Sequence, residues 1–139
     1  MKKFLSVILV GVLFFTLCSC VKTPQNVIKD SDECIVITTA ETDYEITKNT
    51  RLIDYMDTLK EKGELDFSIE SGMITVIDGV KNANDFSKCW MLYTSDTEYS
   101  SNAFGTVIYD GKTYGSAIVG AGELPIKKGE IYIWYYQEF

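Results

Sequence analysis

The chain has 139 residues, of which 13 are Lys or Arg, 20 are Asp or Glu and none is His, giving a formal net charge of −7 at pH 7. Such an acidic chain lacks the basic surface that neutralises phosphates, which argues against nucleic-acid binding. The absence of histidine excludes Ser-His-Asp and Cys-His catalysis, His-ligated zinc and His-based pH sensing. No other residue pattern recommends catalysis or metal binding, so we expect a protein that is not an enzyme.

Residues 1–19 have the pattern of a secretory signal peptide. A basic start at Lys2 and Lys3 precedes an uncharged apolar run over residues 4–17, which is short for a membrane-spanning helix. The run ends in Leu-Cys-Ser-Cys, which resembles the lipobox of bacterial lipoproteins. The resemblance implies cleavage before Cys20 and lipidation of Cys20. Two or more acyl chains anchor a protein firmly, so we expect it on the extracytoplasmic face of the cell membrane.

Residues 20–32 are interpreted as the lipidated cysteine and a tether, because residues 21–32 are polar, include Pro24 and show no sustained periodicity. Residues 33–139 suit one domain with a real core. Loss of Lys2 and Lys3 with the signal peptide takes the net charge from −7 to −9. The chain shows no internal repeat.

Residues 34–40 (CIVITTA) are apolar on both faces, which predicts an interior strand. Extended alternation resumes at residues 44–47 after a polar turn, so we expect these two segments to form a hairpin. Cys34 and Cys89 are the two thiols of the predicted domain. A disulfide between them and two separate buried thiols both stay open at this point.

The segment NTRLIDYMDTLKEKG, residues 49–63, predicts the one helix. Asn49 or Thr50 can cap its start, and Gly63 can adopt the left-handed conformation that ends it. Four apolar residues recur at helical spacing and predict an inner face that packs on a sheet: Leu52, Ile53, Met56 and Leu59.

Further strands are predicted at residues 65–69, 73–77, 88–94, 106–109, 112–114 and 124–126 and at the end of the chain. Asp110-Gly111 favours a two-residue hairpin turn between two of them. Residues 115–122 (GSAIVGAG) lack the Walker lysine and the Gly-x-Gly-x-x-Gly order. We interpret this stretch as a mobile surface loop and not as a phosphate-binding loop.

The last strand, IYIWYY, has two different faces because side chains alternate along a strand. One face carries Ile131, Ile133 and Tyr135, and the other carries Tyr132, Trp134 and Tyr136. We expect the isoleucine face to meet the helix and the aromatic face to point away from it. The aromatic face is then either covered by residues 99–117 or left open as a binding platform.

The order of elements predicts an α+β fold with one helix packed on one face of a sheet. A hairpin, a helix and then further strands suggest a β-grasp-like mixed sheet, with residues 99–117 as an extra hairpin insertion. In a β-grasp the first and last strands lie side by side at the sheet centre, which we expect of residues 34–40 and the last strand.

Four segments, in this order, resemble the transcobalamin C-terminal-like domain, a β-grasp family found in many bacterial surface proteins: TRLIDYMDTLKEKG, SGMITVIDGV, CWMLY and PIKKGEIYIWYY. The resemblance covers roughly residues 34–136. Two departures fall where a ligand would be met. The Asn-Gly that often follows the Trp strand is missing, and residues 99–117 form a longer segment than usual.

The resemblance implies cobalamin or another corrinoid as the ligand, with no other cofactor. The family's contacts come from the loop before one strand and from the Trp strand. Carried over to this chain, they fall on Ser71, Gly72, Met73, Trp90 and Leu92. In the vertebrate cobalamin carriers this domain packs over the corrinoid as the smaller of two lobes, and we expect no larger helical lobe in this chain. Weak binding or a second protein is therefore implied.

Two functions stay open for this predicted domain. The first is a lipoprotein that captures a corrinoid or similar small molecule. The second is a protein-interaction module, such as an accessory subunit of an envelope or transporter complex, because Tyr and Trp are common binding anchors. The residues predicted to contact a ligand also have plainer interpretations. Trp90 suits a packing residue, and Ser71-Gly72 suits a turn.

Overall fold

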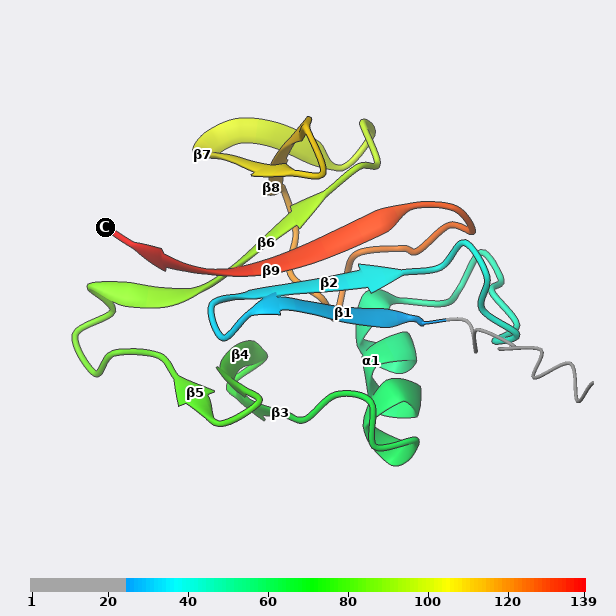
Figure 1. The fold of residues 1–139 in the computed structure, drawn as a ribbon, viewed down its shortest axis with the longest axis horizontal. Coiled ribbons are helices and arrows are strands. Elements are labelled where there is room, and N and C mark those ends of the chain that lie inside the picture. Colours follow the sequence, from blue (N-terminus) through cyan, green and yellow to red (C-terminus); the bar gives the residue numbers. More distant parts are fainter. Residues whose placement is uncertain (1–24) are drawn as a thin grey trace, which may run out of the picture.

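The computed structural model describes residues 25–139, which form nine strands and one helix (Figure 1). The predicted signal peptide, the lipidation site at Cys20 and the first residues of the tether lie outside the described residues. The elements are β1 (Val27–Ser31), β2 (Cys34–Thr38), α1 (Leu52–Glu61), β3 (Phe67–Glu70), β4 (Met73–Ile77), β5 (Val80–Lys81), β6 (Lys88–Thr94), β7 (Ser100–Tyr109), β8 (Lys112–Ala117) and β9 (Ile131–Glu138). Among these residues, no helix is long and apolar enough to cross a membrane.

The strands form two sheets, and the predicted α+β class is confirmed. Six strands pair in the order β1-β2-β9-β6-β8-β7, and three pair in the order β3-β4-β5. Every pairing within residues 25–139 is antiparallel, so the prediction of a mixed sheet is wrong. The physical reason lies in the connections, because α1 leads from the large sheet to the small one. A parallel pair would need a crossover that returns to the same sheet.

Strand β2 lies between β1 and β9, with Val36 opposite Ile28 on one side and Ile133 on the other. The expected contact between residues 34–40 and the last strand is therefore present, but β2 is second from the edge and not at the sheet centre. Two other predictions about this region are wrong. Residues 27–31 belong to the sheet and not to a tether, and residues 44–47 form no strand because both edges of β2 are already paired.

Helix α1 is shorter than predicted and has a different cap. The carboxylate of Asp54 accepts a hydrogen bond from the Arg51 backbone N–H at 2.8 Å, so neither Asn49 nor Thr50 caps the helix. Gly63 ends the helix at φ +74°, as predicted. Of the predicted stripe, Leu52, Met56 and Leu59 are buried, Ile53 is partly buried, and Tyr55 joins them.

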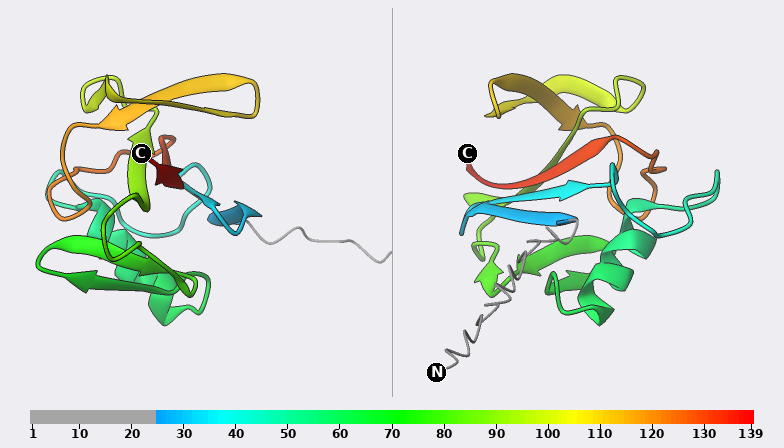
Figure 2. Two further views of the ribbon diagram at one scale, coloured as in Figure 1. Left: turned by 90° about the vertical axis from the view of Figure 1, so that its left-hand side faces the viewer. Right: turned by 45° about the vertical axis from the view of Figure 1, so that its right-hand side comes forward.

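The large sheet separates two apolar cores, and the assignment of the faces of β9 is reversed from the prediction. Tyr132, Trp134 and Tyr136 pack toward α1 and the small sheet, whereas Ile131 and Ile133 pack on the other side. The β7–β8 hairpin, which contains the predicted Asp110-Gly111 turn, covers this second side (Figure 2). Alternation was predicted correctly, but the larger side chains fill the larger space beside the helix. All described elements share these two cores, so residues 25–139 form one folding unit.

Cys34 and Cys89 are free thiols, so the disulfide alternative is wrong. Cys34 on β2 is opposite Tyr135, and Cys89 on β6 is opposite Gln137, so β9 runs between them. Two strand spacings separate the Cα atoms by about 10 Å or more, beyond the ~7 Å limit for a disulfide. Burial raises the pKa of both thiols, which keeps them protonated at neutral pH.

Candidate functional site: an apolar groove beside strand β6

An apolar groove with a volume of about 320 Å³ opens between β4, β6 and the segment that follows β8. Each of these elements contributes a short run of residues to its lining. The lining consists of Gly72–Ile74, Trp90–Leu92, Phe104, Ala117–Ala121 and Trp134. These residues are distant in the sequence, and the fold brings them together.

The groove exists because β6 is only partly paired on one side. Strand β6 runs along β9 from Lys88 to Thr94, but it meets β8 only at Tyr93 and Thr94. Strand β8 ends at Ala117, and the chain then turns toward the start of α1. The edge of β6 from Trp90 to Leu92 is therefore left beside an open space.

The lining carries no ionisable side chain, and part of its rim is exposed apolar surface. Met73, Phe104 and Ile118 are 47%, 56% and 56% exposed. Exposed apolar residues that gather around a hollow mark a binding site more often than single ones do. The groove therefore favours an uncharged, apolar group and offers no acid, base or nucleophile to it.

Both tryptophans of the chain line this groove. Trp90 is held rigidly, because its indole N–H donates to the Val80 carbonyl at 2.8 Å and its ring lies 5.3 Å from that of Tyr136. The buried indole N–H of Trp134 has no hydrogen-bond partner among the described residues. The two rings both line the groove, and one buried indole N–H among the described residues is left without an acceptor.

Five of the eight predicted ligand residues meet at the groove: Gly72, Met73, Trp90, Leu92 and Trp134. Ser71 lies just outside it, in the tight turn between β3 and β4 where Ser71 and Gly72 both have positive φ.

Tyr132 and Tyr136 do not reach the groove. Tyr132 is fully buried, and its hydroxyl accepts a hydrogen bond from the Lys127 backbone N–H at 2.9 Å. Burial raises the pKa of Tyr132 to about 12. The hydroxyl of Tyr136 donates to the Lys81 carbonyl at 2.7 Å. The idea of an open aromatic platform on β9 is therefore wrong, and only Trp134 of that face contributes.

Phe104 and residues 117–121 were not predicted as site residues. The glycine-rich segment is tied to the helix and is not the free loop expected, because the carbonyls of Ala121 and Leu124 accept hydrogen bonds from Ile53 and Leu52 at 3.0 and 2.9 Å. These backbone N–H groups have no partner inside the helix. The apolar pair Ile118-Val119 within a glycine-rich stretch was the available signal.

Comparisons with protein-family models, curated proteins and solved structures found no match for this chain. Within residues 25–139, no three His, Cys, Asp or Glu side chains come together in a group that could hold a metal ion.

Proposed function

We propose that this chain is an extracytoplasmic lipoprotein whose domain binds an apolar ligand in the groove beside β6, without catalysis. One observation carries the proposal: an uncharged hollow with two buried tryptophans and an exposed apolar rim of Met73, Phe104 and Ile118. Burial of apolar surface from water is the main driving force for such binding, at roughly 25 cal/mol per Å².

A corrinoid is the ligand that we propose first, and it rests on the resemblance to the transcobalamin C-terminal-like domain. Four residues that this resemblance marks as contacts line the groove: Gly72, Met73, Trp90 and Leu92. A β-grasp relationship belongs to the same proposal. The pairing of β2 with β9 inside the sheet, and a helix as the next element after β2, support it.

Fluorescence titration with cobalamin tests this ligand directly, because both tryptophans line the groove. The experiment uses residues 21–139, which contain the whole folding unit. We expect saturable quenching of tryptophan fluorescence together with a shift in corrin absorbance. Absence of both changes at ligand concentrations up to about 1 mM would exclude a corrinoid that binds with a dissociation constant below about 1 mM, which corresponds to a binding free energy of roughly 4 kcal/mol.

A second candidate is a protein-interaction module for an envelope or transporter complex. The exposed Met73, Phe104 and Ile118 favour it, because a partner's apolar side chain could enter the groove between them. A purified envelope protein that binds residues 21–139, and that loses binding when Phe104 is changed to Ser, would support this candidate over the corrinoid.

The lipid anchor is tested in the full-length chain expressed in a bacterium. We expect Cys20→Ser to abolish labelling with radioactive palmitate and to release the protein from the membrane fraction. Cys18→Ser is the matched control, since Cys18 lies before the proposed cleavage site and should leave labelling intact. Equal labelling of wild type and Cys20→Ser would contradict the anchor.

A further inference from the structure

Strand β7 is a free edge of the large sheet, and it has little protection at residues 106–109, which follow the irregularity between Ser101 and Thr106. It is last in the strand order, and its ten residues, SSNAFGTVIY, include no charge. The other edge strand, β1, carries Lys29 and Asp30. Edge strands usually carry charges, prolines or covering segments that prevent pairing with other chains. Strand β7 has neither charge nor proline, and Ile108 on it is 77% exposed.

The free hydrogen-bonding groups of β7 can be assigned from its turn. Asp110 and Gly111 have φ of +49° and +72°, and Tyr109 is opposite Lys112 across this two-residue turn. In such hairpins the residues flanking the turn exchange both backbone hydrogen bonds, and the direction alternates along the strand. The backbone N–H and C=O groups of Tyr109 and Val107 therefore point toward β8. The backbone N–H and C=O groups of Ile108 and Thr106 point away from the sheet.

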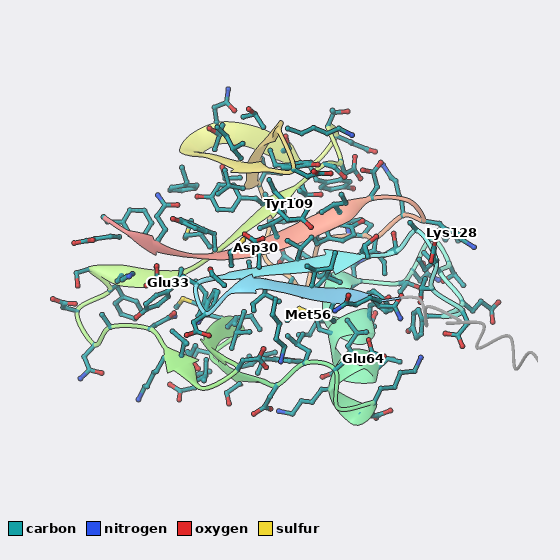
Figure 3. The ribbon with its side chains drawn as sticks, viewed as in Figure 1. Asp30, Glu33, Met56, Glu64, Tyr109 and Lys128 are labelled. Carbon is teal, nitrogen blue, oxygen red and sulfur yellow. The ribbon has the colours of Figure 1, made fainter. Side chains whose placement is uncertain are left out.

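A cavity of about 380 Å³ lies along the same strand. Residues 106–109 form one wall, Cys34, Ile133 and Tyr135 contribute apolar surface, and Asp30 and Ser31 of β1 complete it. Both edges of the large sheet therefore border one cavity, through Asp30 of β1 and Tyr109 of β7, which are labelled in Figure 3. This cavity lies on the Ile133 side of the sheet, whereas the groove beside β6 holds Trp134.

The cavity has an acidic character. No lysine or arginine lines it, and Asp30 forms no salt bridge within residues 25–139. Burial, followed by the nearby carboxylate of Asp30, raises the pKa of Tyr109. Asp110 adds a second carboxylate at the end of β7. These exposed carboxylates would attract a cationic group at this place.

We propose that β7 accepts an extended segment of a partner protein as an added strand, with apolar and basic side chains at alternate positions (residues i and i+2) of the face that meets the cavity. The backbone groups of Ile108 and Thr106 pair with the segment, an apolar side chain enters the cavity, and a Lys or Arg approaches Asp30. Strand addition of this kind takes affinity from backbone hydrogen bonds and specificity from side-chain pockets. A second copy of this chain is disfavoured as the occupant, because each copy carries a net charge of −7.

The test uses NMR titration of residues 21–139 with the peptide Val-Thr-Lys-Thr-Val-Thr-Lys-Thr, blocked at both ends, in which Val and Lys share one face of the strand. We expect shifts and slowed hydrogen exchange at the Ile108 and Thr106 amides at about 1 mM peptide. The same peptide with glutamate in place of lysine, and a fully N-methylated peptide that cannot donate hydrogen bonds, should not bind.

Protein variants separate the contribution of backbone hydrogen bonds to peptide binding from that of the side chains. Ile108→Pro removes a free-edge N–H without removing a bond to β8, as edge strands tolerate, and should abolish binding. Ile108→Ala keeps that N–H and should bind within severalfold of wild type. Asp30→Asn should weaken binding about tenfold.

Three results would overturn the proposal. The first is no change at the β7 amides with the lysine peptide, and the second is equal binding of the glutamate peptide. The third is protection of these amides by self-association without peptide. If Ile108→Pro does not fold, the N-methylated peptide makes the same test. Binding here is independent of the groove, so failure of cobalamin to bind leaves it unaffected.

Discussion

Tyr132 shows how one hydroxyl can place a large aromatic side chain in the middle of a core. The side chain is fully buried, yet its oxygen has a partner in the Lys127 backbone N–H at 2.9 Å. A buried polar group is costly unless it is hydrogen-bonded. This bond therefore allows the aromatic face of β9 to pack against the helix.

Replacing Tyr132 with Phe should lower the free energy of unfolding by about 1–3 kcal/mol, because the Lys127 N–H loses its acceptor. Urea denaturation followed by circular dichroism measures the change. Tyr135→Phe is the control, since Tyr135 is 37% exposed and a surface change of this kind shifts stability by about 0.5 kcal/mol or less. Equal effects of the two variants would contradict the role of the buried hydroxyl.

The Tyr132→Phe variant should also change how the free energy of unfolding depends on pH. Burial raises the pKa of Tyr132 from 10.0 to about 12 in the folded state. Between these pH values the unfolded chain has lost a proton that the folded chain still holds. The free energy of unfolding is therefore intact below pH 10 and falls as the pH rises toward 12. Tyr132→Phe should make that fall shallower, and an unchanged slope would contradict the raised pKa.

At the level of residues, the sequence predicted which side chains share a face of a strand better than it predicted what that face packs against. Strand alternation correctly grouped Tyr132, Trp134 and Tyr136 on one face. It could not say which layer this face would meet, because that depends on the volume enclosed by α1 and the small sheet. Five predicted ligand residues share a groove, but the burial of Tyr132 depends on Lys127, and nothing in the sequence pattern links those two.

Helix α1 depends on Asp54 at its start, through the hydrogen bond from the Arg51 N–H at 2.8 Å. Asp54→Ala should destabilise the protein by about 1 kcal/mol, since a cap and a favourable dipole interaction are both lost. Asp57→Ala removes an exposed carboxylate from the middle of the same helix and serves as the control. Thermal denaturation should show a clear loss for Asp54→Ala, and a larger loss for Asp57→Ala would contradict the capping assignment.

Gly115 allows β8 to pass close to β7. A Cβ atom at this position would lie 2.6 Å from the Ser101 carbonyl oxygen and 2.8 Å from the Ser100 hydroxyl. Gly115→Ala should therefore destabilise the hairpin by about 1–3 kcal/mol, because backbone atoms must shift. Gly122→Ala, where a Cβ meets nothing within 4 Å, is the matched control. The unfolding free energies of the two variants should differ, and equal values would contradict the close approach.

Elements with a strong local pattern were predicted within a few residues, as for α1, β4 and β6. Strand β1 was missed because only Val27 and Ile28 of its five residues are apolar, as suits an edge. Its pairing then left no free edge of β2 for residues 44–47. Strand β1 therefore pairs with β2 although residues 44–47 have the stronger strand pattern, because strand pairing depends on the whole sheet.

The whole molecule presents two different surfaces on opposite sides of one sheet. The groove beside β6 is apolar and uncharged, and the cavity along β7 has Asp30 on its wall. The groove draws residues from 72 to 134, so no local pattern could have outlined it. The ribbon views show the hairpin on one side of the large sheet and α1 with the small sheet on the other (Figures 1 and 2).

The groove beside β6 can be tested as the corrinoid site by comparing two apolar side chains of the same strand. Phe104 lines the groove and Ile108 does not, and they are 56% and 77% exposed. In the cobalamin titration, Phe104→Ser should weaken binding about tenfold, equivalent to roughly 1.4 kcal/mol, whereas Ile108→Ser should leave the affinity unchanged. Equal affinities for both variants, or no binding by the wild-type domain, would contradict the groove as the corrinoid site.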